Sequence, residues 1–440
     1  MSPFSFDKEK LVYPSEFQAV ILAGYGNRLY PLTEEATLPK ALLPVANRPL
    51  VSYQLAWLEA ARVRDIIIVT QAQVAPSIRD WLQKMYEAPP GAKIEVEALK
   101  EWSGTADALR QVRPRIRGDV VVLSCDIVCP DLSSYAFVDH YRLHNPSASA
   151  VFYNLGAIEA AADRPLDKED DAAHDLIGVD PDSSRLVMLA SEADSVDTLS
   201  VSVRLLEKFP KIRFYRTYQD AHIYIFKRWV LDLLVQRKTI GRVREGLLPL
   251  LVEAQYKSHD FGALLDGAHD VLADAKPLST MGHSGDVKTI KVTAVLSDPN
   301  SFLCRANTLW RYLEANRVLA RPSGIVGGGS GGSAGTSTKS PLPPDVLVGD
   351  GTKIAERTRI KRSVIGHHCV IGKNVRMANT VLMDYCVIGD NVRLENCVVC
   401  NSGRVMDDAH LRDCRVAVQY VVEAHTEAKN ESFVDFSFGP

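Results

Sequence analysis

The chain has 440 residues, of which 46% are apolar and 24% are charged, and its formal net charge is −3 at pH 7. This length suffices for two or three domains, and the small negative charge argues against nucleic acid as a partner, because nucleic-acid-binding proteins present basic surfaces. No apolar stretch approaches the roughly 20 residues of a membrane span, and residues 1–14 lack the apolar segment of a signal peptide. Eight irregularly spaced cysteines do not suggest a disulfide framework. We therefore expect a folded protein of the reducing cytosol with no membrane segment.

Strand-like and helix-like segments alternate from residue 17 to about residue 153. The predicted strands are Phe17–Ala23, Ile66–Thr70 and Val120–Cys125, and the predicted helices are Pro49–Ala61 and Ile78–Met85. Short β-branched runs favour buried strands, whereas an apolar stripe with helical spacing favours a helix packed on a sheet. This alternation predicts a Rossmann-like α/β domain with a mostly parallel sheet.

Changes in composition mark the ends of this domain. We expect residues 1–16 to form a flexible N-terminus and the α/β domain to span residues 17–321. Residues 322–344 contain the glycine- and serine-rich run Gly327–Ser333 and several prolines, which together predict a linker. The acidic run Asp167–Asp171 predicts a solvated loop inside the domain.

The sequence after the linker repeats itself. Residues 369–381 match residues 386–398 at nine of thirteen positions, at an offset of 17. Valines recur every five or six residues through both copies, at Val364, Val370, Val375, Val381, Val387, Val392 and Val398. One small apolar side chain per six residues is typical of a left-handed parallel β-helix, whose narrow core these valines would fill. We expect the β-helix over residues 345–425 and a short tail over residues 426–440.

A glycine-rich loop follows the first predicted strand. Its candidate phosphate-binding residues are Gly24, Gly26, Asn27 and Arg28. Glycines allow backbone N–H groups to approach a phosphate closely. The loop has neither the third glycine of the dinucleotide-binding motif nor the lysine and hydroxyl residue of a P-loop. Considered alone, it is equally well explained as a plain turn between a strand and a helix.

Three further segments contribute groups of the kind that bind nucleotides. Lys40 lies between two prolines, Gly104-Thr105-Ala106 opens a predicted helix, and Asp126 follows a predicted strand. Ligands of open α/β sheets bind beyond the carboxyl ends of the strands, where such residues collect. The position of Asp126 is equally compatible with holding a metal ion and with accepting hydrogen bonds from backbone N–H groups.

Together these segments resemble the sugar-nucleotide pyrophosphorylases, a family of nucleotidyltransferases, over residues 17–226. The resemblance implies a triphosphate cradled by the glycine loop and Arg28, and a leaving pyrophosphate neutralised by Lys40. It also implies a base beside Gly104–Ala106 and a metal ion at Asp126 that polarises the attacked phosphate.

The departures from that family concern its chemistry. Ala23 and Asn27 replace a glycine and a threonine of the family's loop. Ser191–Asp194 lacks the lysine that grips the sugar phosphate in that family, and Asp220–His222 replaces the family's Asn-Ala-Gly, which reads the sugar. No second metal-binding aspartate is recognisable. Because nucleotidyl transfer depends on positioned charge, these losses predict a retained scaffold without catalysis. We expect no required cofactor and at most weak binding of a nucleotide or Mg²⁺.

A closer resemblance is to the family of gamma subunits of eukaryotic translation initiation factor 2B. It is carried by Pro39–Pro49, Gly104–Arg110, Leu123–Asp126, Ile177–Asp180, Pro210–Phe214 and Asp220–Tyr224. The resemblance implies a scaffold that pairs with the epsilon subunit and joins the alpha, beta and delta subunits. The assembly exchanges GDP for GTP on initiation factor 2.

Two other functions share parts of this pattern. A sugar-nucleotide pyrophosphorylase such as a mannose-1-phosphate guanylyltransferase has the same two-domain plan but needs the missing motifs. An acyltransferase would use the β-helix for catalysis, usually through a histidine at a trimer interface. Cys397 and Cys400, near His367, His368 and Cys369, resemble a zinc pattern, but stacked small residues of a β-helix explain them better, so no metal site is predicted.

Overall fold

The computed structural model of the chain describes residues 16–33, 38–100, 103–155, 175–191, 201–257, 290–320 and 343–434. The expected flexible N-terminus up to residue 15, the linker up to residue 342 and the acidic run Asp167–Asp171 lie outside these ranges. Residues 435–440 of the expected tail also lie outside them. The same is true of residues 192–194, which belong to the segment that lacks the sugar-phosphate lysine.

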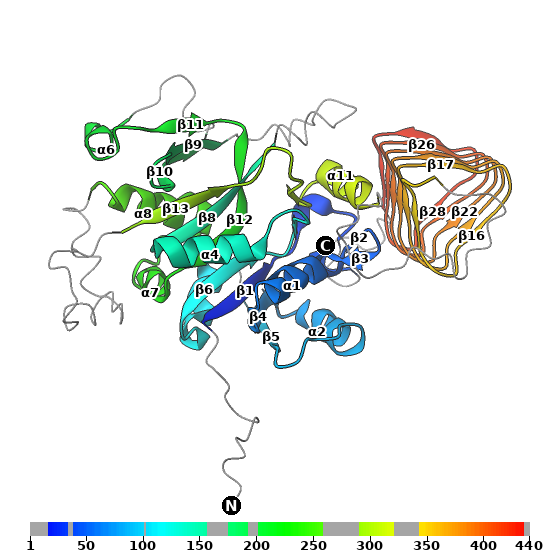
Figure 1. Cartoon of the computed structure of the whole chain (residues 1–440). Helices are drawn as coiled ribbons and strands as arrows, with labels where there is room; N and C mark the ends of the chain where they lie inside the picture. Colours follow the sequence, from blue (N-terminus) through cyan, green and yellow to red (C-terminus); the bar gives the residue numbers. More distant parts are fainter. Residues whose placement is uncertain are drawn as a thin grey trace, which may run out of the picture.

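A ten-stranded sheet organises the first domain (Figure 1). In spatial order its strands are β11 (Arg213–Tyr215), β9 (Asp175–Asp180), β10 (Arg185–Ser191), β13 (Val292–Leu296), β8 (Ala148–Asn154), β12 (Tyr218–Phe226), β6 (Asp119–Ser124), β1 (Phe17–Ala23), β4 (Asp65–Gln71) and β5 (Lys93–Leu99). Strands β6, β1, β4 and β5 pair in parallel, and β12 pairs antiparallel with β6 and β8. The parallel part contains the three strands predicted from the sequence.

Helices cover both faces of this sheet. They are α1 (Leu50–Ala60), α2 (Ala75–Lys84), α3 (Thr105–Val112), α4 (Ser134–His144), α6 (Val203–Lys208), α7 (Arg228–Gln236), α8 (Leu248–Ala254) and α11 (Leu309–Leu319). Two small two-stranded sheets accompany them: β2 (Pro44–Val45) with β3 (Arg48–Pro49), and β7 (Ile127–Val128) with β14 (Cys304–Arg305). Val20 and Leu22 of β1 pack with α3, α7 and α8, whereas Ala19 and Ile21 pack with α1 and α4. Strand β1 is apolar throughout because both of its faces are covered. No helix within the described ranges is both long and apolar enough to cross a membrane.

The strand order reverses at β1. From β1 the chain adds β4 and β5 on one side, and β6 then pairs with the other edge of β1. The loops that follow β1 and β6 therefore separate over a crevice at the carboxyl ends of the strands, which is where open α/β sheets bind ligands. The glycine loop follows β1 and Asp126 follows β6, so the fold brings these two candidate segments together.

The C-terminal domain is a left-handed parallel β-helix built from three sheets (Figure 1). The interface sheet contains β15 (Leu347–Val348), β18 (Val364–Ile365), β21 (Val381–Leu382), β24 (Val398–Val399), β27 (Arg415–Val416) and β30 (Ser432–Phe433). The valine sheet contains β16 (Lys353–Ile354), β19 (Val370–Ile371), β22 (Val387–Ile388), β25 (Arg404–Val405) and β28 (Val421–Val422). The arginine sheet contains β17 (Arg359–Lys361), β20 (Arg376–Ala378), β23 (Arg393–Glu395), β26 (His410–Arg412) and β29 (Glu427–Lys429). Strands β29 and β30 pair in register with the coil before them, so the β-helix continues beyond residue 425, where we had expected it to end.

Two of the valines predicted for the β-helix core lie outside it. Val370 and Val387 are 46% and 38% exposed, and Ile371 and Ile388 take the core positions in the same strands. Successive side chains of a strand point to opposite faces, so a Val-Ile pair places only one of its two side chains inside. In β19 and β22 of the valine sheet, the isoleucine that follows each repeated valine therefore faces the core, and the valine faces outward.

The interface sheet packs against the first domain. Val364, Val381 and Val398, also predicted for the β-helix core, instead join an apolar cluster with residues of α11 and of the segment before α1. Asn47 Nδ2 donates a hydrogen bond to the carbonyl oxygen of Ile365 at 2.8 Å across this contact. Figure 1 shows α11, β2 and β3 on the side of the first domain that meets the β-helix. The two domains therefore share a buried apolar contact.

Candidate functional site

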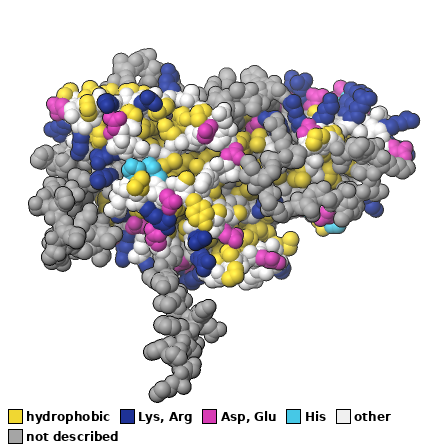
Figure 2. All heavy atoms as spheres, viewed as in Figure 1, with side chains coloured by type: hydrophobic (Ala, Val, Ile, Leu, Met, Phe, Trp, Pro, Cys, Tyr) yellow, Lys and Arg dark blue, Asp and Glu magenta, His cyan; other side chains and the backbone are white. Residues whose placement is uncertain are grey.

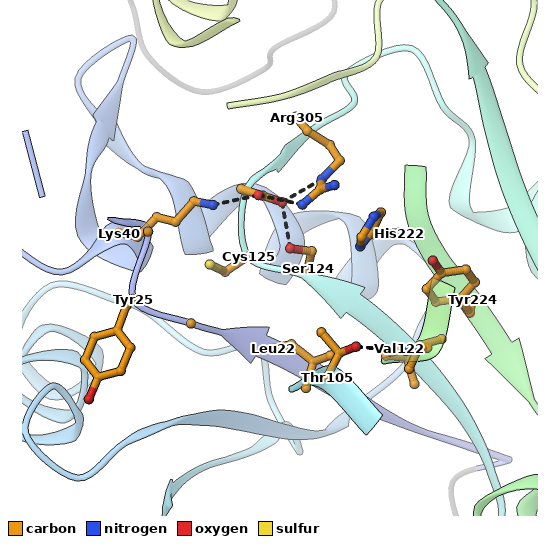
Figure 3. A pocket seen from close by; sticks show the side chains of 14 residues that line it. Leu22, Tyr25, Lys40, Thr105, Val122, Ser124, Cys125, His222, Tyr224 and Arg305 are labelled. Atoms are coloured by element: carbon orange, nitrogen blue, oxygen red, sulfur yellow. Dashed lines mark hydrogen bonds and ion pairs between the residues drawn. The ribbon is translucent and has the colours of Figure 1, made fainter. Parts of the chain in front are cut away.

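Five of the residues predicted to bind a nucleotide line one pocket (Figure 3). They are Gly24, Gly26, Lys40, Thr105 and Asp126. The pocket lies over the crevice between β1 and β6 and encloses about 180 Å³. Small-molecule sites usually enclose roughly 300–1,000 Å³, so the described residues leave little room for a sugar nucleotide.

The glycine loop is shaped around a lysine. Gly26 has a φ of +83°, in the left-handed region that favours glycine, and a Cβ there would lie 2.8 Å from Cδ of Lys40. The loop thus lets the Lys40 side chain cross it on the way to Asp126. The next residues form a 3₁₀ turn, η1 (Asn27–Leu29), in which Arg28 is exposed and does not line the pocket.

The Gly104-Thr105-Ala106 turn holds a neighbouring loop of the chain. Ala106 N donates a hydrogen bond to the Gly241 carbonyl at 3.1 Å, and Thr105 Oγ1 accepts one from Val243 N at 2.9 Å. A Cβ atom at Gly104 would lie 2.3 Å from the Gly241 oxygen, so only glycine fits this position. Gly104 and Ala106 do not line the pocket, and the turn expected to meet a base is engaged in contacts within the domain.

The carboxylate of Asp126 is completely buried and is shared by three side chains. Lys40 Nζ donates to Oδ2 at 2.7 Å, and Ser124 Oγ donates to Oδ1 at 2.6 Å. Arg305 donates to both oxygens, from Nη2 to Oδ2 at 3.0 Å and from Nε to Oδ1 at 3.2 Å. Figure 3 shows Lys40 and Arg305 extending toward each other from opposite sides. A metal ion and backbone N–H groups were the partners suggested by the sequence; the structure supplies side-chain donors instead.

These contacts determine the charge of the site. Burial by itself would raise the pKa of Asp126, but Arg305 and Lys40 hold it well below its usual range. Mg²⁺ is held in proteins mainly by carboxylate and other oxygen ligands, and Asp126 is the only carboxylate among the described residues that line the pocket. Because both of its oxygens already accept hydrogen bonds from cations, the site as arranged does not fit a divalent metal ion. No group of three potential metal ligands occurs elsewhere in the described ranges.

His222 occupies the position at which the resembled enzymes have a glycine. Its φ is +55°, and its imidazole lines the pocket. Nε2 is buried and has no hydrogen-bond partner among the described residues. Burial lowers the pKa of His222 well below its usual range, so the ring is neutral at pH 7. A neutral imidazole therefore fills space where the resemblance implies recognition of a sugar.

A buried carboxyl group, that of Asp220, lies two residues before this histidine in the chain. Asp220 accepts hydrogen bonds from the Tyr224 hydroxyl at 2.5 Å and from His222 N at 2.7 Å. Burial raises the pKa of Asp220 to about 6, although the Tyr224 hydrogen bond acts in the opposite direction. Nearby, Arg244 Nη2 pairs with Asp175 Oδ1 at 2.5 Å. Asp220 is thus a carboxyl group that titrates close to neutral pH.

We expect Asp220→Asn to change the pH dependence of stability. The raised pKa means that the folded protein retains a proton that the unfolded chain releases, so the stabilisation is present at low pH and is lost as the pH rises through about 6. Between pH 5 and pH 7 the free energy of unfolding of the wild type should therefore fall by about 1 kcal/mol more than that of the variant. Urea unfolding at the two pH values measures this change, and a pH-independent difference between the two proteins would contradict it.

Arg305 is the site residue that no sequence motif reveals. It lies in β14, which pairs with β7 directly after Asp126, and Ala306 N donates a hydrogen bond to the Asp126 carbonyl at 2.8 Å. Arg305 and Asp126 are 179 residues apart in the chain. Two residues so far apart in the chain leave no recognisable motif in the sequence. Only the pairing of β7 with β14 brings the guanidinium of Arg305 to the carboxylate of Asp126.

Comparisons with known proteins agree with this two-domain plan. A nucleotidyl transferase family model matches residues 18–161, and a model of the eIF2B subunit epsilon LbH domain matches residues 332–428. A mannose-1-phosphate guanyltransferase of Candida albicans is 27% identical, over 53% of this chain and 55% of its own length.

The similarity to subunits of one initiation factor is more extensive. Translation initiation factor eIF2B subunit gamma of Dictyostelium discoideum is 28% identical over 81% of this chain and 89% of its own length. The gamma subunit of Schizosaccharomyces pombe is 36% identical over 353 residues, which are 79% of this chain and 74% of that subunit. The chain therefore belongs to the family of eIF2B gamma subunits.

Proposed function

We propose that this chain is a non-catalytic subunit of eIF2B, which pairs with the epsilon subunit in the cytosol and promotes exchange of GDP for GTP on initiation factor 2. The observation that supports the loss of catalysis is the arrangement of Lys40, Asp126 and Arg305. In the nucleotidyltransferases that the chain resembles, the equivalent carboxylate would hold a metal ion. Here two side-chain cations already neutralise it.

Recruitment of a metal ion would require both ion pairs to break. A metal accelerates nucleotidyl transfer by stabilising negative charge that develops on the phosphate oxygens. Separating a buried guanidinium from its carboxylate leaves an uncompensated charge, at a cost of about 3–5 kcal/mol. We therefore propose that the subunit requires no cofactor and that a nucleotide or Mg²⁺ binds to it weakly at most.

The proposed partners rest on family membership and not on the pocket. The relatives are named as gamma subunits of eIF2B, and an epsilon subunit of Dictyostelium discoideum is 25% identical over 69% of this chain. Two related chains can pair through corresponding surfaces, which makes the epsilon subunit the proposed immediate partner. The alpha, beta and delta subunits would complete the assembly. We propose neither nucleic acid nor a membrane as a direct partner.

Two assays on the full chain test this proposal. We expect no release of pyrophosphate from GTP and mannose 1-phosphate in the presence of Mg²⁺, under conditions in which a mannose-1-phosphate guanyltransferase turns over. We also expect an equimolar complex with the epsilon subunit by gel filtration with light scattering. That complex should release labelled GDP from initiation factor 2 faster than the epsilon subunit alone. Metal-dependent pyrophosphate release would favour the enzyme, and failure to form the complex would reject the subunit assignment.

A further inference from the structure

The arginine sheet of the β-helix presents a basic outer face. Its outward side chains are Arg359, Lys361, Arg376, Ala378, Arg393, Glu395, His410, Arg412, Glu427 and Lys429. The residue between each outward pair points inward, and Ile360, Met377 and Leu394 are buried in the core. Six of the outward side chains are cationic and two are anionic, although the whole chain has a net charge of −3. Figure 2 shows Lys and Arg side chains gathered where Figure 1 labels β17 and β26.

Three arginines form a column on this face. Arg359 pairs in register with Arg376, and Arg376 with Arg393, so the three side chains leave equivalent positions of successive coils. All three are exposed, and none forms an ion pair with any residue that the structure describes. Of the two acidic residues of the face, Glu395 lies 3.7 Å from the guanidinium of Arg412, and Glu427 lies 3.7 Å from the imidazole of His410, a pair that is ionic only when the histidine is protonated. The charge of the column is therefore available to a partner.

From this column we infer that the arginine sheet binds the acidic face of an α-helix in a partner protein. Neighbouring strands lie about 4.8 Å apart, and one turn of an α-helix rises about 5.4 Å. A helix lying along the β-helix axis would thus present one carboxylate per turn to one arginine per coil. The mismatch accumulates to only about 1 Å over three coils, within the reach of an arginine side chain. An extended strand presents side chains to one face about every 6.7 Å and loses register at the second arginine.

The same face lacks the groups that single-stranded nucleic acid uses. Such surfaces combine basic residues with aromatic side chains on which bases stack, and no outward position of the arginine sheet is Phe, Tyr or Trp. A rigid ladder of guanidinium groups suits carboxylates, which arginine binds through paired hydrogen bonds. This inference concerns a surface distinct from the pocket and holds whether or not the pocket is catalytic.

The test uses the full chain and a designed peptide. The probe is a labelled alanine-based helix of roughly 20 residues, with glutamates on one face, one per turn. Its composition-matched isomer has the same glutamates distributed around the helix. The binding variant is Arg376→Glu with Arg393→Glu. The control variant, Lys353→Glu with Arg404→Glu, reverses two exposed charges on the neighbouring valine sheet. Fluorescence anisotropy measures affinity, and circular dichroism checks that each variant is folded.

We expect the peptide with its glutamates on one face to bind the wild-type chain more tightly than the isomeric peptide does. Its affinity should fall as salt is added, because salt screens the attraction between charges. The binding variant should weaken this affinity about tenfold or more, because two attractive pairs become repulsive, while the control should change it less than about twofold. Equal binding of peptide and isomer, or equal effects of the two variants, would overturn the inference. Tighter binding of a single-stranded RNA oligonucleotide, lost in the same binding variant, would assign the face to nucleic acid instead.

Discussion

Replacement of Asp126 by asparagine is expected to lower the free energy of unfolding by about 3–5 kcal/mol at pH 7. The carboxylate is completely buried, and its removal leaves the guanidinium of Arg305 and the ammonium of Lys40 without their shared counter-charge. All five tryptophans lie between residues 57 and 310, so their fluorescence during urea unfolding reports on the domain that contains this site.

A matched control is Asp182→Asn, which removes one member of the exposed pair with Lys211, where both side chains are more than 60% exposed. Exposed ion pairs contribute about 0–1 kcal/mol, so this variant should unfold almost as the wild type does. The low pKa of Asp126 means that its contribution is present above pH 3.8 and is lost as the pH falls below that value. The difference in the free energy of unfolding between D126N and the wild type should accordingly become smaller in acid. Similar losses from the two variants at pH 7 would refute the buried ion-pair account.

A second large effect is expected for Val398→Asp, about 4 kcal/mol or more of lost stability. Val398 is completely buried between the interface sheet and the first domain, in the cluster that includes Tyr312 of α11. A carboxylate introduced there would have to be desolvated without a partner or take up a proton. Either outcome weakens the contact between the domains. Urea unfolding followed by circular dichroism measures the change in stability.

Val387→Asp provides the control, because it makes the same substitution on the same β-helix at a side chain that is 38% exposed. The new carboxylate would remain hydrated, so we expect a loss of about 1 kcal/mol or less, the cost of placing aspartate in a strand position. If the two variants were equally unstable, the cause would be the loss of a valine from a strand and not the burial of charge. Their difference therefore tests whether Val398 is buried where Val387 is exposed.

The sequence was sufficient for the elements whose apolar pattern is local. Strand β1 is apolar at every position because helices cover both of its faces, and α1 follows the predicted helix Pro49–Ala61 to within one residue at each end. The 17-residue repeat was visible because each coil of the β-helix must supply the same small side chains at the same corners. The glycine loop, Lys40 and Asp126 were identified because their spacing along the chain resembles a known family.

The sequence by itself determined that the chain has an α/β domain with a nucleotide-site pattern followed by a β-helix, because these features repeat or cluster over short stretches. Only the tertiary structure decided what the pattern does. It placed Arg305 against Asp126 from 179 residues away and turned Val370 outward and Val398 toward the first domain. A hexapeptide spacing states how often an apolar residue returns, but not which of two neighbouring side chains points inward. That choice depends on what packs against each sheet, and the neutralisation of a buried charge depends on whichever cation the fold brings to it.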